Sequence, residues 1–163
     1  MTSQFIGLRT VLGRLRHLFS SRNRLTRPDT RRRRPRSIFI RHVDAGSCND
    51  CELEITALSN PIHDLERFGL HIVASPRHAD VLLVTGPFTR SMEAATLAAF
   101  RAMPEPRRVV TVGDGFRPDG IFGGSYAVMP LPDEMVPYWV MHVLGDPPSP
   151  QQILEVLLTF ETK

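Results

Sequence analysis

Residues 44–54 constrain this chain more than any other stretch, because they place both of its cysteines at one turn. The stretch reads DAGSCNDCELE and contains Cys48 and Cys51. An apolar extended run, residues 37–43, precedes it, and an apolar helical pattern begins at residue 53. This order predicts a strand, a loop of small residues and the start of a helix. Two sulfurs so placed can bind one metal centre or pair with each other, and helix N–H groups favour their thiolate forms.

The Cys-x-x-Cys motif has three common interpretations, of which the first is excluded here. A zinc ribbon needs a second cysteine pair, and the chain has only these two cysteines. A redox-active dithiol fits a strand-to-helix turn. Two incidental core thiols are the third possibility, because free cysteine is often buried as a small apolar residue. The low cysteine count excludes a disulfide-stapled secreted scaffold and indicates a reducing compartment.

Charge divides the chain into two parts. Residues 1–36 contain eleven arginines and one acid, a net charge of +10, whereas residues 37–163 carry a net charge of −7. The basic pI therefore describes an N-terminal arm and not the remaining domain. This asymmetry argues against nucleic-acid binding by the domain as a whole. We predict two regions, a basic arm (1–36) and a globular domain (37–163).

Within the arm, residues 4–19 have the spacing of a basic amphipathic helix. Five apolar side chains recur at helical intervals: Phe5, Leu8, Leu12, Leu15 and Phe19. This pattern favours docking on an anionic membrane surface or a partner groove; a transit peptide or a helix packed on its own domain are the alternatives.

Residues 20–36 are polar, basic and broken by proline, which predicts a linker. Each arginine near an anionic leaflet contributes about 1 kcal/mol, and nucleic-acid binding by the arm is the competing hypothesis. Residues 37–44 interrupt any export-signal apolar region with charged side chains, and no run approaches the ~18 apolar residues of a membrane span. We therefore expect a peripheral protein at the cytoplasmic face of the membrane.

From residue 37 onward, extended and helical patterns alternate. The predicted strands are 38–43, 70–74, 80–85, 108–112 and 138–144, and the predicted helices are 50–59, 62–68, 92–103 and 150–160. This alternation predicts an α/β fold with a doubly wound, mostly parallel sheet. Ligands of such sheets bind beyond the carboxyl ends of the strands, where loops 44–51, 113–125 and 145–150 should converge. The sequence has neither a G-x-G-x-x-G nor a P-loop motif, so a nucleotide site is not supported.

Four segments together resemble one known family. They are GSCNDCELEI (46–55), ADVLLVTGPFT (79–89), VGDG…GIFGGSYAV (112–128) and GDPPSPQQILEVLL (145–158). They are similar to the small iron–sulfur subunit shared by membrane-bound nickel–iron hydrogenases, formate hydrogenlyases and NADH:quinone oxidoreductase (its 20-kDa subunit). The resemblance covers about residues 37–160, and the Cys-x-x-Cys form is similar to the hydrogenase-type branch.

The resemblance implies a flavodoxin-like domain with a 4Fe-4S cluster at the junction with a large subunit. Four cysteines hold the cluster in that family. The matching positions here are Cys48, Cys51, Gly115 and Asp146, so half of the thiolates are missing. Iron–sulfur clusters are held mainly by thiolates, and a carboxylate is a harder, poorer ligand. The implied metal ligands are therefore Cys48, Cys51 and Asp146, around a partly lost 4Fe-4S site.

The resemblance also implies partners. It predicts a small subunit, not catalytic alone, that binds a hydrogenase-type large subunit and docks it to the membrane subunits of the same complex. One alternative is a true electron-transfer subunit with a modified 4Fe-4S cluster. Another is an interaction module whose basic arm binds nucleic acid.

Other ionisable residues carry weaker hypotheses. Glu52 and Glu54 flank the motif and could relay protons, or could be surface helix carboxylates. Five histidines lack ligand spacing and are interpreted as surface or core residues: His42, His63, His71, His78 and His142.

Overall fold

The computed structural model describes residues 37–46, 49–117 and 119–162. The predictions for residues 1–36, and the position of Cys48, lie outside the described residues. None of the helices in the described part of the chain is long and apolar enough to cross a membrane.

Five parallel strands form one sheet with the order β2-β1-β3-β4-β5. Their bounds are Ile38–Asp44 (β1), Leu70–Ile72 (β2), Val81–Thr85 (β3), Arg108–Val112 (β4) and Trp139–Val143 (β5). The predicted α/β class is confirmed, and every strand pair is parallel. This order is the one found in flavodoxin, where the chain reverses direction across the sheet between β1 and β3.

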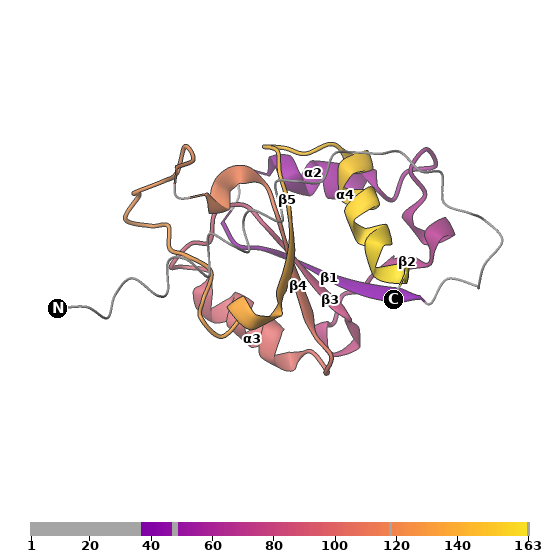
Figure 1. Cartoon of the computed structure of the whole chain (residues 1–163), viewed down its shortest axis with the longest axis horizontal. Helices are drawn as coiled ribbons and strands as arrows, with labels where there is room; N and C mark the ends of the chain where they lie inside the picture. The colour runs from indigo at the N-terminus through magenta and orange to yellow at the C-terminus, as the bar shows by residue number, and fades with distance from the viewer. Residues whose placement is uncertain (1–36, 47–48, 118, 163) are drawn as a thin grey trace, which may run out of the picture. The chain divides into compact units, whose positions relative to one another are not determined.

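Three α-helices cover the sheet on its two faces (Figure 1). The helices are α2 (Asp50–Ala57), α3 (Glu93–Ala102) and α4 (Pro150–Leu158). Helices α2 and α4 lie on one face, and α3 lies on the other. A capping box begins α4: the backbone N–H of Ser149 donates to Gln152 Oε1 (2.9 Å), and the Ser149 hydroxyl accepts from the Gln152 N–H.

Short 3₁₀ turns replace some predicted elements. They are Leu65–Phe68, Pro76–His78, Asp114–Phe116, Val136–Tyr138 and Thr159–Thr162. The helical turn predicted at 62–68 is a 3₁₀ helix over Leu65–Phe68 only, because the Asn60 side chain accepts bonds from the N–H groups of Ile62 and His63 just before it. An Asn side-chain amide that bonds nearby backbone N–H groups competes with the backbone bonds of a helix.

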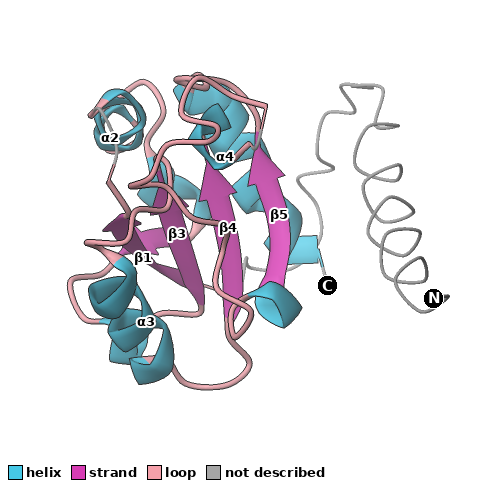
Figure 2. Cartoon of the chain, turned by 90° about the vertical axis from the view of Figure 1, so that its left-hand side faces the viewer, coloured by secondary structure: helices cyan, strands magenta, loops and turns pink. Residues whose placement is uncertain are grey.

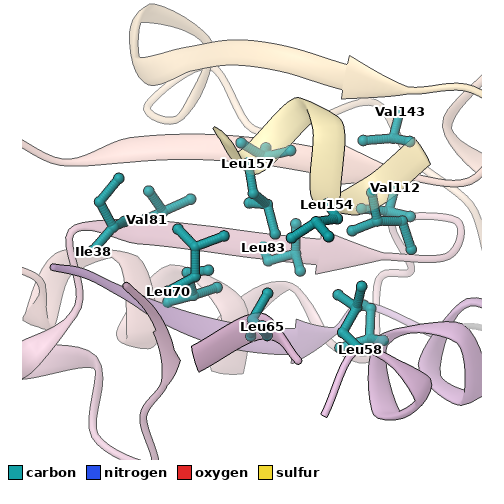
Figure 3. Packing of buried hydrophobic residues seen from close by; sticks show 14 of the residues in the cluster. Ile38, Leu58, Leu65, Leu70, Val81, Leu83, Val112, Val143, Leu154 and Leu157 are labelled. Carbon is teal, nitrogen blue, oxygen red and sulfur yellow. The ribbon is translucent and has the colours of Figure 1, made fainter. Parts of the chain in front are cut away.

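The core consists of two apolar layers divided by the sheet. One layer joins α2 and α4 to the sheet through side chains that include Leu58, Leu83 and Leu154 (Figure 3). The other contains Phe88, Phe100 and Met135 beneath α3. All five residues of β3 are buried, because this central strand is covered on both faces. The carboxyl ends of β1, β3, β4 and β5 therefore meet at one edge, beside the N-termini of α2 and α4 (Figure 2).

Leu83→Ala should lower the free energy of unfolding by about 2–5 kcal/mol, because Leu83 is 1% exposed in the central strand. Leu53→Ala is the matched control, since Leu53 is 60% exposed on α2 and should change stability by about 0.5 kcal/mol or less. Urea unfolding measures both. Equal losses in the two variants would contradict the described core.

Candidate functional site

A cysteine and a carboxylate face each other at the carboxyl edge of the sheet. Cys51, in the first turn of α2, is 1% exposed. Its Sγ lies 4.0 Å from Oδ1 of Asp146, in the loop after β5. This is the outer limit of a thiol–carboxylate hydrogen bond. The structure thus brings together two of the three predicted metal ligands; the third, Cys48, lies outside the described residues.

Gly113, which sequence reasoning missed, is the β4-loop residue that faces this pair. A Cβ built on Gly113 would lie 2.8 Å from Cys51 Sγ and 3.6 Å from Asp146 Oδ1. The φ angle of Gly113 is +96°, which side chains rarely adopt. Glycine there permits the loop after β4 to pass directly over the sulfur. The sequence signal was only a glycine ending a strand, which does not reveal what it faces.

Gly115, the predicted third cluster position, is packed against the loop after β3. It is buried in the turn Asp114–Phe116, and a Cβ on it would lie 2.7 Å from the backbone N of Pro87. Its backbone does line a cavity of about 270 Å³ that Asp146 also lines. A side chain at position 115 would therefore meet the loop after β3.

Negative charge is concentrated around Asp146. Partial desolvation raises the pKa of this carboxyl, and the carboxylates of Asp114 and Asp50 raise it further. Asp114 also accepts a bond from the Gly145 N–H through its Oδ1 (3.2 Å), which fixes the loop that carries Asp146. The Asp146 carboxyl therefore retains its proton more readily than a free aspartate does.

A second polar group, which sequence reasoning did not assemble, lies between α2 and the sheet. The Thr85 hydroxyl donates to Oε1 of Glu52. His42 Nε2 lies 3.0 Å from Thr85 Oγ1 and 3.8 Å from Glu52 Oε1. The Glu52 side chain is only 14% exposed, so it is not a surface carboxylate. The Glu52–Thr85–His42 cluster ties the first turn of α2, and hence Cys51, to β1 and β3.

His142 belongs to a separate buried group on β4 and β5. Its Nδ1 lies 2.8 Å from Thr111 Oγ1, which also accepts a bond from Trp139 Nε1 (3.0 Å). The Phe116 ring packs edge-on against the imidazole. His142 is therefore a half-buried residue bonded within the sheet, between the surface and core positions considered from sequence. Among the described residues, no three His, Cys, Asp or Glu side chains are arranged to hold a metal ion.

The available donors do not fit a four-thiolate 4Fe-4S cluster. The whole chain contains two cysteines. Gly115 contributes no side-chain donor, and a Cβ on it would meet Pro87. Asp146 offers one hard oxygen, which iron–sulfide centres accept only occasionally.

The fold and the site define a doubly wound α/β domain with a cysteine at the switch-point edge of its sheet. Residues 48–160 match the family described as NADH ubiquinone oxidoreductase, 20 Kd subunit. The chain belongs to this family, and the resemblance inferred from its four motifs is confirmed.

Two curated relatives are similar over most of this chain. Formate hydrogenlyase subunit 7 of Escherichia coli K12 is 43% identical over 119 residues, which are 73% of this chain and 46% of that protein. The probable membrane-bound hydrogenase subunit mbhJ of Pyrococcus furiosus is 41% identical over 128 residues, 77% of this chain and 75% of that one. The chain thus spans less than half the length of the first relative.

Two solved structures share the fold. A chain of an archaeal respiratory membrane complex, the membrane-bound sulfane sulfur reductase, superposes with a TM-score of 0.63 at 24% identity, covering 77% of this chain and 71% of its own. A chain of the NAD+-reducing NiFe-hydrogenase superposes with a TM-score of 0.50 at 18% identity, covering 77% and 93%.

Stability should fall as the pH drops below about 6.5, because burial lowers the pKa of His42 and of His142 from that value in the folded chain. Glu52 opposes the shift at His42 and Asp114 opposes it at His142, without reversing either. The unfolded chain binds these protons first, so acid favours unfolding. Urea unfolding at about pH 7.5 and about pH 5.5 measures the loss. The double variant His42→Gln/His142→Gln should lose less stability than the wild type between these two pH values. An equal loss would refute the assignment of the acid sensitivity to these two histidines.

Thr85→Val should lower the free energy of unfolding by about 1–3 kcal/mol, because it removes the hydroxyl that donates to the buried Glu52 carboxylate. Thr56→Val is the control: its hydroxyl bonds the Glu52 backbone carbonyl (2.8 Å) on the exposed side of α2, where loss should be below about 1 kcal/mol. Thermal and urea unfolding compare them, and a Thr85→Val variant as stable as Thr56→Val would exclude a structural role for the Glu52–Thr85–His42 cluster.

Proposed function

We propose that this chain is the small subunit of a membrane-associated oxidoreductase complex, of the type of energy-converting hydrogenase and NADH:quinone oxidoreductase. It joins a hydrogenase-type large subunit to the membrane subunits and does not itself hold a complete 4Fe-4S cluster. It contributes a docking surface to the complex and is not catalytic alone.

One observation carries this proposal: Cys51 faces Asp146 at 4.0 Å, at the edge where the family resemblance places two cluster thiolates. The names of the curated relatives, a formate hydrogenlyase subunit and a membrane-bound hydrogenase subunit, support the type of complex. The strand order 2-1-3-4-5 supports the flavodoxin-like class expected for such a subunit.

The proposal places the subunit peripherally at the cytoplasmic face of the membrane. Residues 1–36, with a net charge of +10, would contact anionic headgroups beside the membrane subunits. The charge of −7 on residues 37–163 would keep the domain itself off that surface.

A modified cluster is the second candidate, and the burial of Cys51 favours it. A buried sulfur 4.0 Å from a carboxylate oxygen could form two neighbouring ligand positions, with Cys48 and a partner residue as the others. Metal-binding thiolates and their neighbours are commonly shielded from solvent. Electron transfer would then pass through this subunit.

Cys51→Ser separates the two candidates in the complex purified anaerobically from its host. We expect the variant complex to assemble and to retain the iron, the acid-labile sulfide and the EPR spectrum of the wild type, because no cluster depends on this sulfur. Asp146→Asn should likewise leave the iron content, the sulfide content and the EPR spectrum of the complex unchanged. Loss of up to about four irons per complex in Cys51→Ser would contradict the proposal, and a parallel loss in Asp146→Asn would establish the modified cluster.

A further inference from the structure

Gly115 is packed against backbone, not against a movable side chain. A Cβ on this residue would lie 2.7 Å from Pro87 N, 2.8 Å from Pro87 Cδ and 3.2 Å from the carbonyl carbon of Gly86. Real Cβ atoms almost never approach other atoms this closely. Adding any side chain at position 115 therefore requires one of two loops to move.

The loop after β3 is held in place on both sides of the contact. Phe88, next to Pro87, is fully buried beneath α3. The Thr89 N–H and hydroxyl both donate to the Ala45 carbonyl, at 2.9 and 2.8 Å. The Met129 N–H donates to the Phe88 carbonyl at 2.8 Å. Displacing Pro87 would disturb these bonds and the core around Phe88.

The turn that carries Gly115 is fixed as well. The Gly113 N–H donates to the Val143 carbonyl (3.0 Å), and the Arg117 N–H donates to the Asp114 carbonyl (2.9 Å). Asp114 Oδ1 accepts the Gly145 N–H. The turn is thus bonded to the end of β5 and to the loop after it, so displacing the turn would strain these bonds.

We infer that the family's third cluster position is closed by backbone packing in this chain, so that restoring both missing cysteines does not restore a four-iron cluster. The two positions without cysteine, 146 and 115, differ in their surroundings. Asp146 is exposed and its side chain reaches toward Cys51, so cysteine could replace it without a clash. A cysteine at position 115 would instead meet Pro87. This inference rests on the proposed loss of the cluster and explains why the loss is structural.

The first test is reconstitution of the full-length chain, under anaerobic conditions, with ferrous iron, ferric iron and sulfide. The chains compared are the wild type, Asp146→Cys and Gly115→Cys/Asp146→Cys. We expect the double variant to bind no more iron and sulfide than Asp146→Cys, and to give no additional EPR signal on reduction. About four irons and four sulfides per chain in the double variant alone would overturn the inference. A full cluster in the wild type would instead overturn the proposed function.

A second measurement keeps the inference falsifiable if the double variant does not fold. Gly115→Ala adds only the clashing methyl group, so we expect its melting temperature to fall by about 4 °C or more. Gly124→Ala is the control, because its Cβ would meet nothing within 4 Å, although its φ of +76° adds backbone strain. A Gly115→Ala variant that melts with the wild type would show that position 115 is open, and would overturn the inference.

Discussion

The parallel pairing of β3 with both β1 and β4 determines where every residue of the site lies. Because the strands run in one direction, the loops that follow β1, β3, β4 and β5 emerge at a single edge. This edge therefore brings together residues that are far apart in the sequence: Cys51 at the start of α2, and Pro87, Gly113 and Asp146 in the other three loops. The complete burial of β3 fixes its place in the centre of the sheet, since an edge position would expose its apolar side chains.

Two interactions of different strength act on the first turn of α2. The Glu52–Thr85–His42 cluster is partly buried and bonded to the sheet, and loss of such a bond typically costs about 1–3 kcal/mol. The contact between Cys51 and Asp146, at 4.0 Å, is too long to contribute comparably. The bonds to the sheet therefore contribute more to the orientation of this helix than the thiol–carboxylate contact does.

The fold could be predicted because its signals are local. Apolar runs such as residues 80–85 and glycine or proline at their ends identify buried strands in any context. The site could be predicted only in part, because it depends on which faces meet after folding. Leu53 fitted the apolar helical pattern yet is exposed, and Cys51 takes its place in the core beside Ile55. The partial burial of Glu52 and the close packing of Gly115 against Pro87 follow from contacts with β3 and the loop after it. Residue spacing does not encode these contacts.

Family membership and cofactor chemistry depend on different residues in this domain. The family match covers residues 48–160, which include four of the five strands and the capping box of α4. The ligand chemistry depends on a few loop positions. One of them, residue 146, is exposed and can change its side chain without affecting the core. Another, residue 115, is enclosed by backbone, so its exchange for glycine allows the loops after β3 and β4 to pack together. Once such packing forms, the scaffold is stabilised in a geometry that no longer accommodates the third thiolate.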